Sequence, residues 1–209
     1  MCWNAEVSLN TFILGSIAAI IAIILNVVPY TLILLVYTVS LIQLMEYYTW
    51  TNINDKKIVY YLSIIGISIL FLQVIILNYN YVKNKKERNV MYILIILFTL
   101  SAILYDYINN KFTMEKAENG HLKWLWVDFP LPILIVGLFL WVYPPIRNND
   151  LLTSLVIITT LSISLYNYYE YKTWGSMWCY IGNSFWLYLV IKSVYLTINN
   201  ITKFTYKWY

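Results

Sequence analysis

The chain has 209 residues, of which 61% are hydrophobic and only 11% are charged. A water-soluble domain has about 25% charged residues, so this composition excludes an ordinary soluble domain and predicts a protein whose solvent is a lipid bilayer. The net charge of +4 is small, and no basic face is concentrated enough to indicate nucleic-acid binding.

The N-terminal residues lack the pattern of a cleaved signal peptide. The first eight residues contain Glu6 and no Lys or Arg, and no small-residue cleavage site follows the first apolar run. We therefore expect this run to remain in the mature protein as a membrane span.

Seven segments are long and apolar enough to cross a membrane, which takes about 20 mostly apolar residues. In chain order the predicted spans are 9–28, 29–50, 58–78, 89–107, 130–145, 151–169 and 176–199. The fifth is the shortest and could begin as early as Trp124. The sequence predicts an all-α integral membrane bundle of seven transmembrane helices.

One segment of eight residues occurs twice. Residues 43–50 return 124 positions later as 167–174, with Glu, Tyr, Thr and Trp identical at matching places. Positions i, i+3 and i+7 of a helix share a face, so each copy is predicted to align an amide, a carboxylate and an indole along one stripe. These side chains are Gln43, Glu46 and Trp50 in the first copy and Asn167, Glu170 and Trp174 in the second.

The repeated segment predicts an internal symmetry of the bundle. It divides the chain into a first three-helix repeat (1–80), a linker helix with a long loop (81–123) and a second three-helix repeat (124–209). Two equal triplets joined by an odd span lie parallel, related by an axis along the membrane normal. The alternative is a chance match in a chain with 21 tyrosines.

Seven spans place the two termini on opposite sides of the membrane. Lys and Arg are divided almost equally between these sides, so the positive-inside rule discriminates weakly. The compact basic cluster 83–88 favours an N-terminus outside and a cytoplasmic C-terminus.

The N-terminal side of the predicted bundle gathers the unusual side chains. Six of the nine tryptophans lie there, with both cysteines and the single histidine. An interfacial aromatic belt is one interpretation, and a one-sided vestibule, which explains the asymmetry, is the other. The set is Cys2, Trp3, Glu46, Trp50, His121, Trp124, Trp126, Asp128, Glu170, Trp174, Trp178 and Cys179.

The repeated acids Glu46 and Glu170 are the candidate ligands, because an ionisable residue inside a span is by default a functional hypothesis. Snorkelling to the headgroups is the alternative. An indole beside a carboxylate and an amide suits an organic cation or a polyol, whereas a carboxylate alone suits a proton or a metal cation. We predict a small transporter or channel-like protein for a cation, proton or small polar solute, with a cavity lined by both acids and no cofactor.

A second hypothesis belongs to another class of protein. A non-catalytic receptor or membrane scaffold would bind a partner through the Trp-rich surface of its N-terminal side, with Trp124 and Trp126 exposed. Cys2 and Cys179 lie on this same predicted side and could form a disulfide; the alternative is two buried free thiols.

Residue counts disfavour the enzyme classes that use seven-span folds. His121 is the only histidine, so neither a multi-histidine zinc site nor a Ser/His/Asp triad at a nucleophile elbow is expected. Lys192 lies in the seventh span, as a retinal-linked lysine would, but the third span has no acid to serve as its counter-ion. We expect a protein that is not an enzyme.

Four stretches together carry a resemblance to a known family: 1–4 (Met-Cys-Trp-Asn), 43–50, 120–126 (Gly-His-Leu-Lys-Trp-Leu-Trp) and 170–179 with its Gly-Ser-Met-Trp-Cys core. The chain resembles polytopic membrane proteins without an assigned activity that begin Met-Cys-Trp and occur in large DNA viruses and some cellular genomes. The resemblance implies a viral origin and a multi-pass protein of a host or virion membrane. The three-one-three plan is similar in topology to PQ-loop and SWEET-type transporters and to the KDEL-receptor fold, although the Pro-Gln dipeptide of the PQ-loop family is absent.

Overall fold

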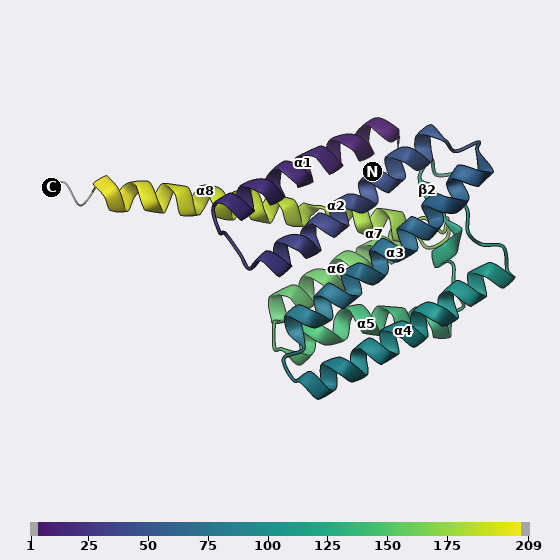
Figure 1. Ribbon diagram of the computed structural model, residues 1–209. Helices are drawn as coiled ribbons and strands as arrows, with labels where there is room; N and C mark the ends of the chain where they lie inside the picture. Colours follow the sequence, from purple (N-terminus) through teal and green to yellow (C-terminus); the bar gives the residue numbers. More distant parts are fainter. Residues whose placement is uncertain (1–3, 206–209) are drawn as a thin grey trace.

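The computed structural model describes residues 4–205, and the side chains of residues 4–199. Its helices are α1 (Ala5–Ile24), α2 (Tyr30–Thr51), α3 (Lys56–Tyr81), α4 (Lys85–Ile108), α5 (Leu131–Arg147), α6 (Leu151–Tyr168), α7 (Trp174–Gly182) and α8 (Ser184–Thr205). An antiparallel hairpin of β1 (Met114–Lys116) and β2 (Leu122–Trp124), followed by one 3₁₀ turn (Leu125–Val127), lies between α4 and α5. Figure 1 shows the bundle, with the last part of α8 extending beyond it.

Six apolar stretches of the described residues are long enough to cross a membrane. They are α1, α2, α3, α4, α6 and the run Trp174–Asn199 that α7 and α8 share. The apolar helix α5 has only 17 residues, about 25 Å of helix against a hydrocarbon core of about 30 Å. The chain is therefore an all-α, multi-pass membrane protein by helix length and hydropathy, and a seventh crossing by α5 stays a prediction.

The predicted spans agree with the helices to within a few residues, except for the last one. The predicted span 176–199 is two helices that meet at Asn183. The Asn183 side-chain amide donates to the Cys179 carbonyl (2.8 Å), and its Oδ1 accepts from Ser40 Oγ of α2 (3.4 Å). A buried amide thus holds the joint between α7 and α8 against α2.

Small side chains let α1 approach its neighbours closely. Its buried positions are Ser8, Gly15, Ala18, Ala19 and Ala22. A methyl group at position 15 would overlap the Ser40 hydroxyl of α2. Because lipid removes the hydrophobic force between helices, close van der Waals contact of this kind drives their association. Helix α1 packs on α2 and α8, whereas α3 contacts α2, α4 and α5.

Three helices end in the same way, with an asparagine in the left-handed conformation. Asn26, Asn110 and Asn149 follow α1, α4 and α5 with φ values of 48°, 52° and 57°. Asn tolerates this conformation better than most residues, and the following N–H then binds a carbonyl of the last turn. These hydrogen bonds run from Val27 to Ala22, from Lys111 to Asp106 and from Asp150 to Pro145.

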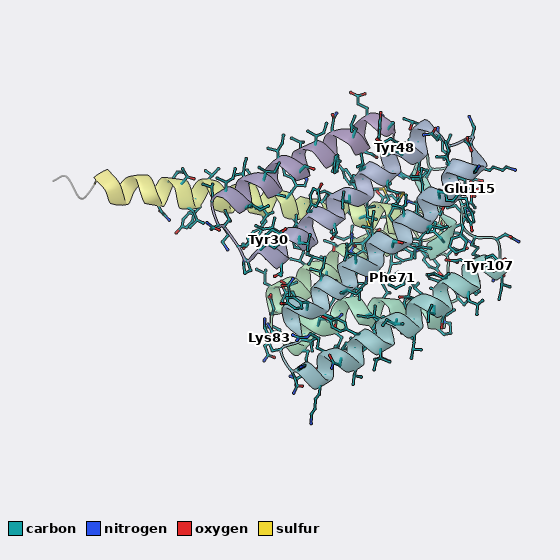
Figure 2. All side chains as sticks on the ribbon, viewed as in Figure 1. Tyr30, Tyr48, Phe71, Lys83, Tyr107 and Glu115 are labelled. Atoms are coloured by element: carbon teal, nitrogen blue, oxygen red, sulfur yellow. The ribbon has the colours of Figure 1, made fainter. Side chains whose placement is uncertain are left out.

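The hairpin caps one end of the bundle. Figure 2 shows Glu115 of the hairpin and Lys83 of the α3–α4 connection at opposite ends. Strand β2 packs on α7, and β1 packs on α3. The largest core cluster lies at this end and joins hairpin residues to α2, α3, α6 and α7. The long connection that the sequence predicts as a loop is thus part of the core.

Candidate functional site

Two tryptophans of the hairpin segment are buried between the helices. Trp124 ends β2 opposite Met114 of β1, and Trp126 follows in the 3₁₀ turn. Each is 1% exposed, and their rings stack at 4.8 Å with an angle of 11° between the planes. Neither indole N–H has a hydrogen-bond acceptor among the described residues. The pair therefore contributes through packing.

Two glycines provide the space for these rings. A Cβ atom at Gly66 of α3 would lie 2.7 Å from Trp126 Cζ2, and one at Gly175 of α7 would lie 3.2 Å from Trp124 Cε3. Contacts shorter than about 3.4 Å between carbon atoms are repulsive. A side chain at position 66 would overlap Trp126, and one at position 175 would require Trp124 to shift by a few tenths of an ångström, so α3 and α7 are shaped to receive the tryptophan pair.

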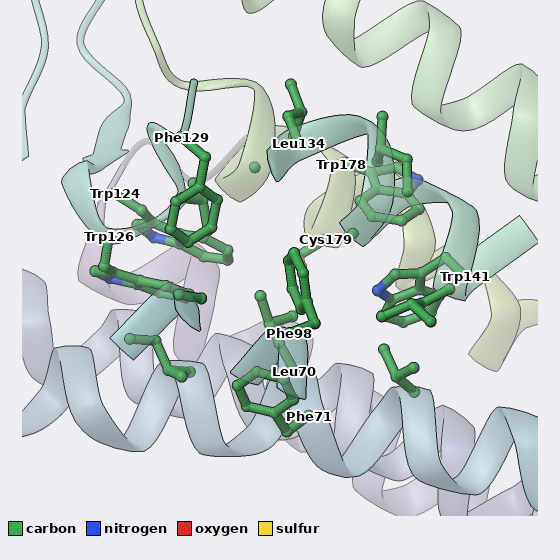
Figure 3. A pocket seen from close by; sticks show the side chains of 18 of the residues that line it. Leu70, Phe71, Phe98, Trp124, Trp126, Phe129, Leu134, Trp141, Trp178 and Cys179 are labelled. Carbon is green, nitrogen blue, oxygen red and sulfur yellow. The ribbon is translucent and has the colours of Figure 1, made fainter. Parts of the chain in front are cut away.

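Beneath the tryptophan pair lies an apolar cavity of about 100 Å³. It is lined by residues of α3, α4, α5 and α7 and by the hairpin segment, among them three phenylalanines and five tryptophans. Figure 3 shows Trp124, Trp126 and Phe129 at one end, Trp141 and Trp178 at the other, and Phe98 between them. The cavity extends from the hairpin toward the middle of α3. The five tryptophans are Trp124, Trp126, Trp141, Trp174 and Trp178.

One carboxylate is buried in α4, one helical turn beyond the cavity-lining Ala102. Asp106, in the last turn of α4, is 0% exposed, and neither of its carboxylate oxygens has a hydrogen-bond partner among the described residues. It is the only acid of the predicted span 89–107. A single acid within an apolar span could have identified Asp106 from the sequence, because burying a charged side chain in a membrane has a high free-energy cost.

An ion-pair cluster joins the hairpin segment to the turn before α7. The Asp128 carboxylate accepts a hydrogen bond from Lys172 Nζ (2.7 Å) and lies 3.4 Å from Lys111 Nζ. Burial alone would raise the pKa of Asp128, but the Lys172 hydrogen bond and the charge of Lys111 outweigh it and lower this pKa below its ordinary value. The same hydrogen bond raises the pKa of Lys172. This cluster fastens the hairpin segment to the bundle.

His121 is buried within the hairpin. It is 6% exposed, and its ring meets Tyr168 of α6 edge to face at 5.4 Å. Burial lowers the pKa of the imidazole, which favours its neutral form. No group of three or more His, Cys, Asp and Glu residues within the described part of the chain could hold a metal ion. His121 therefore has the surroundings of a packed hairpin residue.

The first copy of the repeated segment has the predicted helical form. Gln43, Glu46 and Trp50 lie on α2, and Gln43 Nε2 donates to Glu46 Oε2 at 2.9 Å. Gln43 and Glu46 are both 0% exposed. Trp50 packs against the core cluster beneath the hairpin. The amide and the carboxylate thus meet inside the protein, and a ligand role for them stays a prediction.

The second copy differs, and the predicted stripe is wrong there. Helix α6 ends at Tyr168, Lys172 has a φ of 57°, and Trp174 begins α7. Asn167 and Glu170 are exposed, whereas Trp174 is buried and lines the aromatic cavity. Because Glu46 is buried and Glu170 is exposed, the structure does not bring the two acids into one cavity.

The described tryptophans on the hairpin side are enclosed by the protein and are not arranged as an exposed belt. Trp124, Trp126 and Trp174 are buried in the core, and Trp50 and Trp178 are packed against it. Their enclosure also removes Trp124 and Trp126 from any exposed partner-binding surface. Cys179 is buried in the cavity wall. Cys2 and Trp3 lie outside the described residues, so the predicted Cys2–Cys179 disulfide stays a prediction.

Comparison with known proteins gives no relative: no protein-family model, no curated protein and no solved structure matches the chain.

Proposed function

We propose that this multi-pass membrane protein is a receptor or carrier that binds a small molecule with an apolar ring or short apolar chain in the aromatic cavity. The observation that carries the proposal is the cavity itself, about 100 Å³ lined by five tryptophans and three phenylalanines. Small-molecule sites are concave and mostly apolar, with a few polar groups that fix orientation. An engineered apolar cavity of about 150 Å³ binds benzene, so a single ring is the scale of ligand that this space suits.

The test is binding of toluene to the purified protein in lipid nanodiscs, followed by tryptophan fluorescence. Ala102 of α4 is buried and lines the cavity. Ala102→Phe fills the space and should abolish the saturable signal. Ser101→Phe adds the same side chain at an exposed position of the same helix and should leave binding unchanged. Equal binding by the wild type and Ala102→Phe would overturn the proposal.

Transport of a cation or proton across the membrane is the second candidate function. A fully buried carboxylate on a membrane helix supports it. Glu46 is 0% exposed and accepts a hydrogen bond from Gln43. In proteoliposomes loaded with a pH-sensitive dye, Glu46→Gln should abolish proton flux while the protein stays folded. The matched change at the exposed second-copy acid, Glu170→Gln, should not alter flux. Unchanged flux in Glu46→Gln removes the residue from such a mechanism.

A receptor that uses an exposed tryptophan surface has less support. Trp124 and Trp126 are each 1% exposed, so alanine at either position would act on packing before it acted on a partner. We therefore favour a ligand inside the bundle over a partner on this surface.

A further inference from the structure

Asp106 is a buried acid without a hydrogen-bond partner for its carboxylate among the described residues. Its side chain is fully enclosed, and both carboxylate oxygens lack a hydrogen-bond partner among the described residues. An unsatisfied buried charged group is costly, typically several kcal/mol, and most native structures avoid it. An enclosed carboxylate of this kind indicates a cationic or hydrogen-bond-donating ligand that the polypeptide itself does not supply.

Asp106 lies on the same helix as two residues of the cavity wall. Phe98 and Ala102 line the cavity, and Asp106 follows at the next i+4 step of the same helix. Residues four apart lie above one another on a helix face, so Asp106 is one turn beyond Ala102 toward the hairpin. Phe129, at the hairpin end of the cavity wall, packs on the neighbouring Tyr105 ring at 5.9 Å. The carboxylate therefore belongs to the helical turn that follows the wall of an otherwise apolar space.

The nearest protein charges do not neutralise Asp106. Lys111 and Asp128 are the charged groups that act on it. The Lys111 ammonium is held instead by Asp128, 3.4 Å from its carboxylate, and lies over the Tyr105 ring at 5.0 Å. No ion pair of Asp106 with a lysine or arginine occurs among the described residues. The carboxylate thus has no cationic partner within the described part of the chain.

The aromatic walls of the cavity suit an organic cation better than a metal ion. Aromatic faces attract an ammonium group through their quadrupole, most strongly for tryptophan. A hydrated metal ion prefers six or more oxygen ligands, which one carboxylate in an apolar wall cannot provide. No cluster of three metal-binding side chains lies within the described residues.

We propose that Asp106 and the aromatic cavity together form a binding site for a small organic amine, with the ammonium group at Asp106 and the apolar ring or chain among the tryptophans. The proposal rests on the proposed function, since it names the ligand class of the same cavity. No covalent step is involved.

The experiment compares two probes of the same shape in the wild-type protein in nanodiscs at pH 7, by titration calorimetry. Phenethylamine carries the ammonium group, and propylbenzene replaces it with a methyl group. We expect phenethylamine to bind at least about tenfold more tightly, the factor that one partly buried charge interaction provides. Asp106→Asn should remove this preference and retain propylbenzene binding. Glu115→Gln, at an exposed hairpin acid, is the matched control and should keep the preference.

Each outcome decides between the two proposals. Equal wild-type affinities for the two probes, or an unchanged preference in Asp106→Asn, overturn the amine site but leave the apolar cavity as a binding site. Failure of the wild type to bind either probe overturns both. The wild-type comparison stands even where Asp106→Asn does not fold, because it needs no variant.

Discussion

At the scale of single residues, Trp126 shows how an indole can be structural without a hydrogen bond. Its ring is buried and its N–H has no acceptor among the described residues. Trp126→Phe loses part of the ring's packing but also removes the unsatisfied donor, so we expect a net loss of only about 1–2 kcal/mol in unfolding free energy. Trp126→Ala should cost about 3–5 kcal/mol because it leaves a void. Unfolding in mixed micelles measures both, and equal losses would contradict the packing role.

Asp128 makes stability depend on pH in a defined direction. Its pKa in the folded protein lies below the ordinary value of 3.8. A depressed acid pKa contributes stability that is complete above the unfolded value and is lost as pH falls through the folded value. Because the pair with Lys172 is partly exposed, we expect about 0.5–1 kcal/mol at neutral pH. The stabilities of the wild type and Asp128→Asn should therefore differ at pH 7 and converge below pH 4.

An exposed acid of the same hairpin gives the comparison for this pH effect. Glu118 is exposed, so Glu118→Gln should follow the wild type across the whole pH range. A constant difference between the wild type and Asp128→Asn from pH 7 to pH 3 would show that the aspartate acts without its charge.

The sequence predicts the chemistry of the site better than its positions. A carboxylate beside indoles was expected at Glu46 and Glu170, whereas the aromatic cavity is lined by Trp174 and four other tryptophans, with Asp106 one helical turn beyond its wall. Only Trp174 belongs to both sets. Asp106 could not be located from periodicity, because its burial depends on tertiary packing at the end of α4, where the Lys111 N–H binds its carbonyl and Phe129 packs on Tyr105. Lipid-facing and core-facing positions are both apolar, so the sequence pattern does not show which face of a helix is turned toward the core.

At the scale of helices and strands, identical letters give different structures in the two copies of the repeated segment. The first copy lies within α2, which continues to Thr51. In the second copy the helix stops, because Lys172 is left-handed and the Thr173 N–H binds the Tyr168 carbonyl at 3.2 Å. The approximate extent of each helix follows from the length of its apolar segment, which can be read directly from the sequence. A helix end depends on one backbone conformation, which the repeated letters do not determine.

The asparagine helix ends give a prediction with a neighbour as its control. Asn149 has a φ of 57° after α5, whereas the preceding Asn148 has an ordinary φ of −92°. Asn149→Ala should lower the unfolding free energy by about 1 kcal/mol, and Asn149→Gly should not, because only the alanine is strained there. Asn148→Ala should be neutral in the same unfolding measurement. Equal effects of alanine at both positions would exclude conformational strain as the cause.

The fit between α3 and the hairpin segment can be tested by a double-mutant cycle. A Cβ atom at Gly66 would lie 2.7 Å from Trp126 Cζ2, an atom that phenylalanine lacks. Gly66→Ala should destabilise the wild type although alanine favours helices by about 1 kcal/mol. In the Trp126→Phe background the same change should cost less, giving a coupling of about 0.5–3 kcal/mol. Ser68→Ala, at an exposed site on α3, should show no coupling.

At the scale of the whole molecule, the path of α5 determines the topology. The sequence predicts seven crossings, and α5 is too short to show one by length alone. Single cysteines at Asn54, Glu118, Lys85 and Asn148, in a background without the native cysteines, can be labelled from either side of the membrane. Seven crossings place 54 and 118 on one side and 85 and 148 on the other. Labelling of 148 together with 118 would show that α5 does not cross.

The burial of Trp124 and Trp126 has a consequence for biosynthesis. Their rings pack against Gly66, which is made before them, and the hairpin also packs against Gly175, which is made about 50 residues later. At about 5–20 residues per second, the ribosome needs roughly 3 to 10 seconds to supply α7 after Trp126. During that interval both indoles have only part of their final enclosure. A nascent chain that stops before α7 should therefore expose them to chaperones or to quality-control proteases.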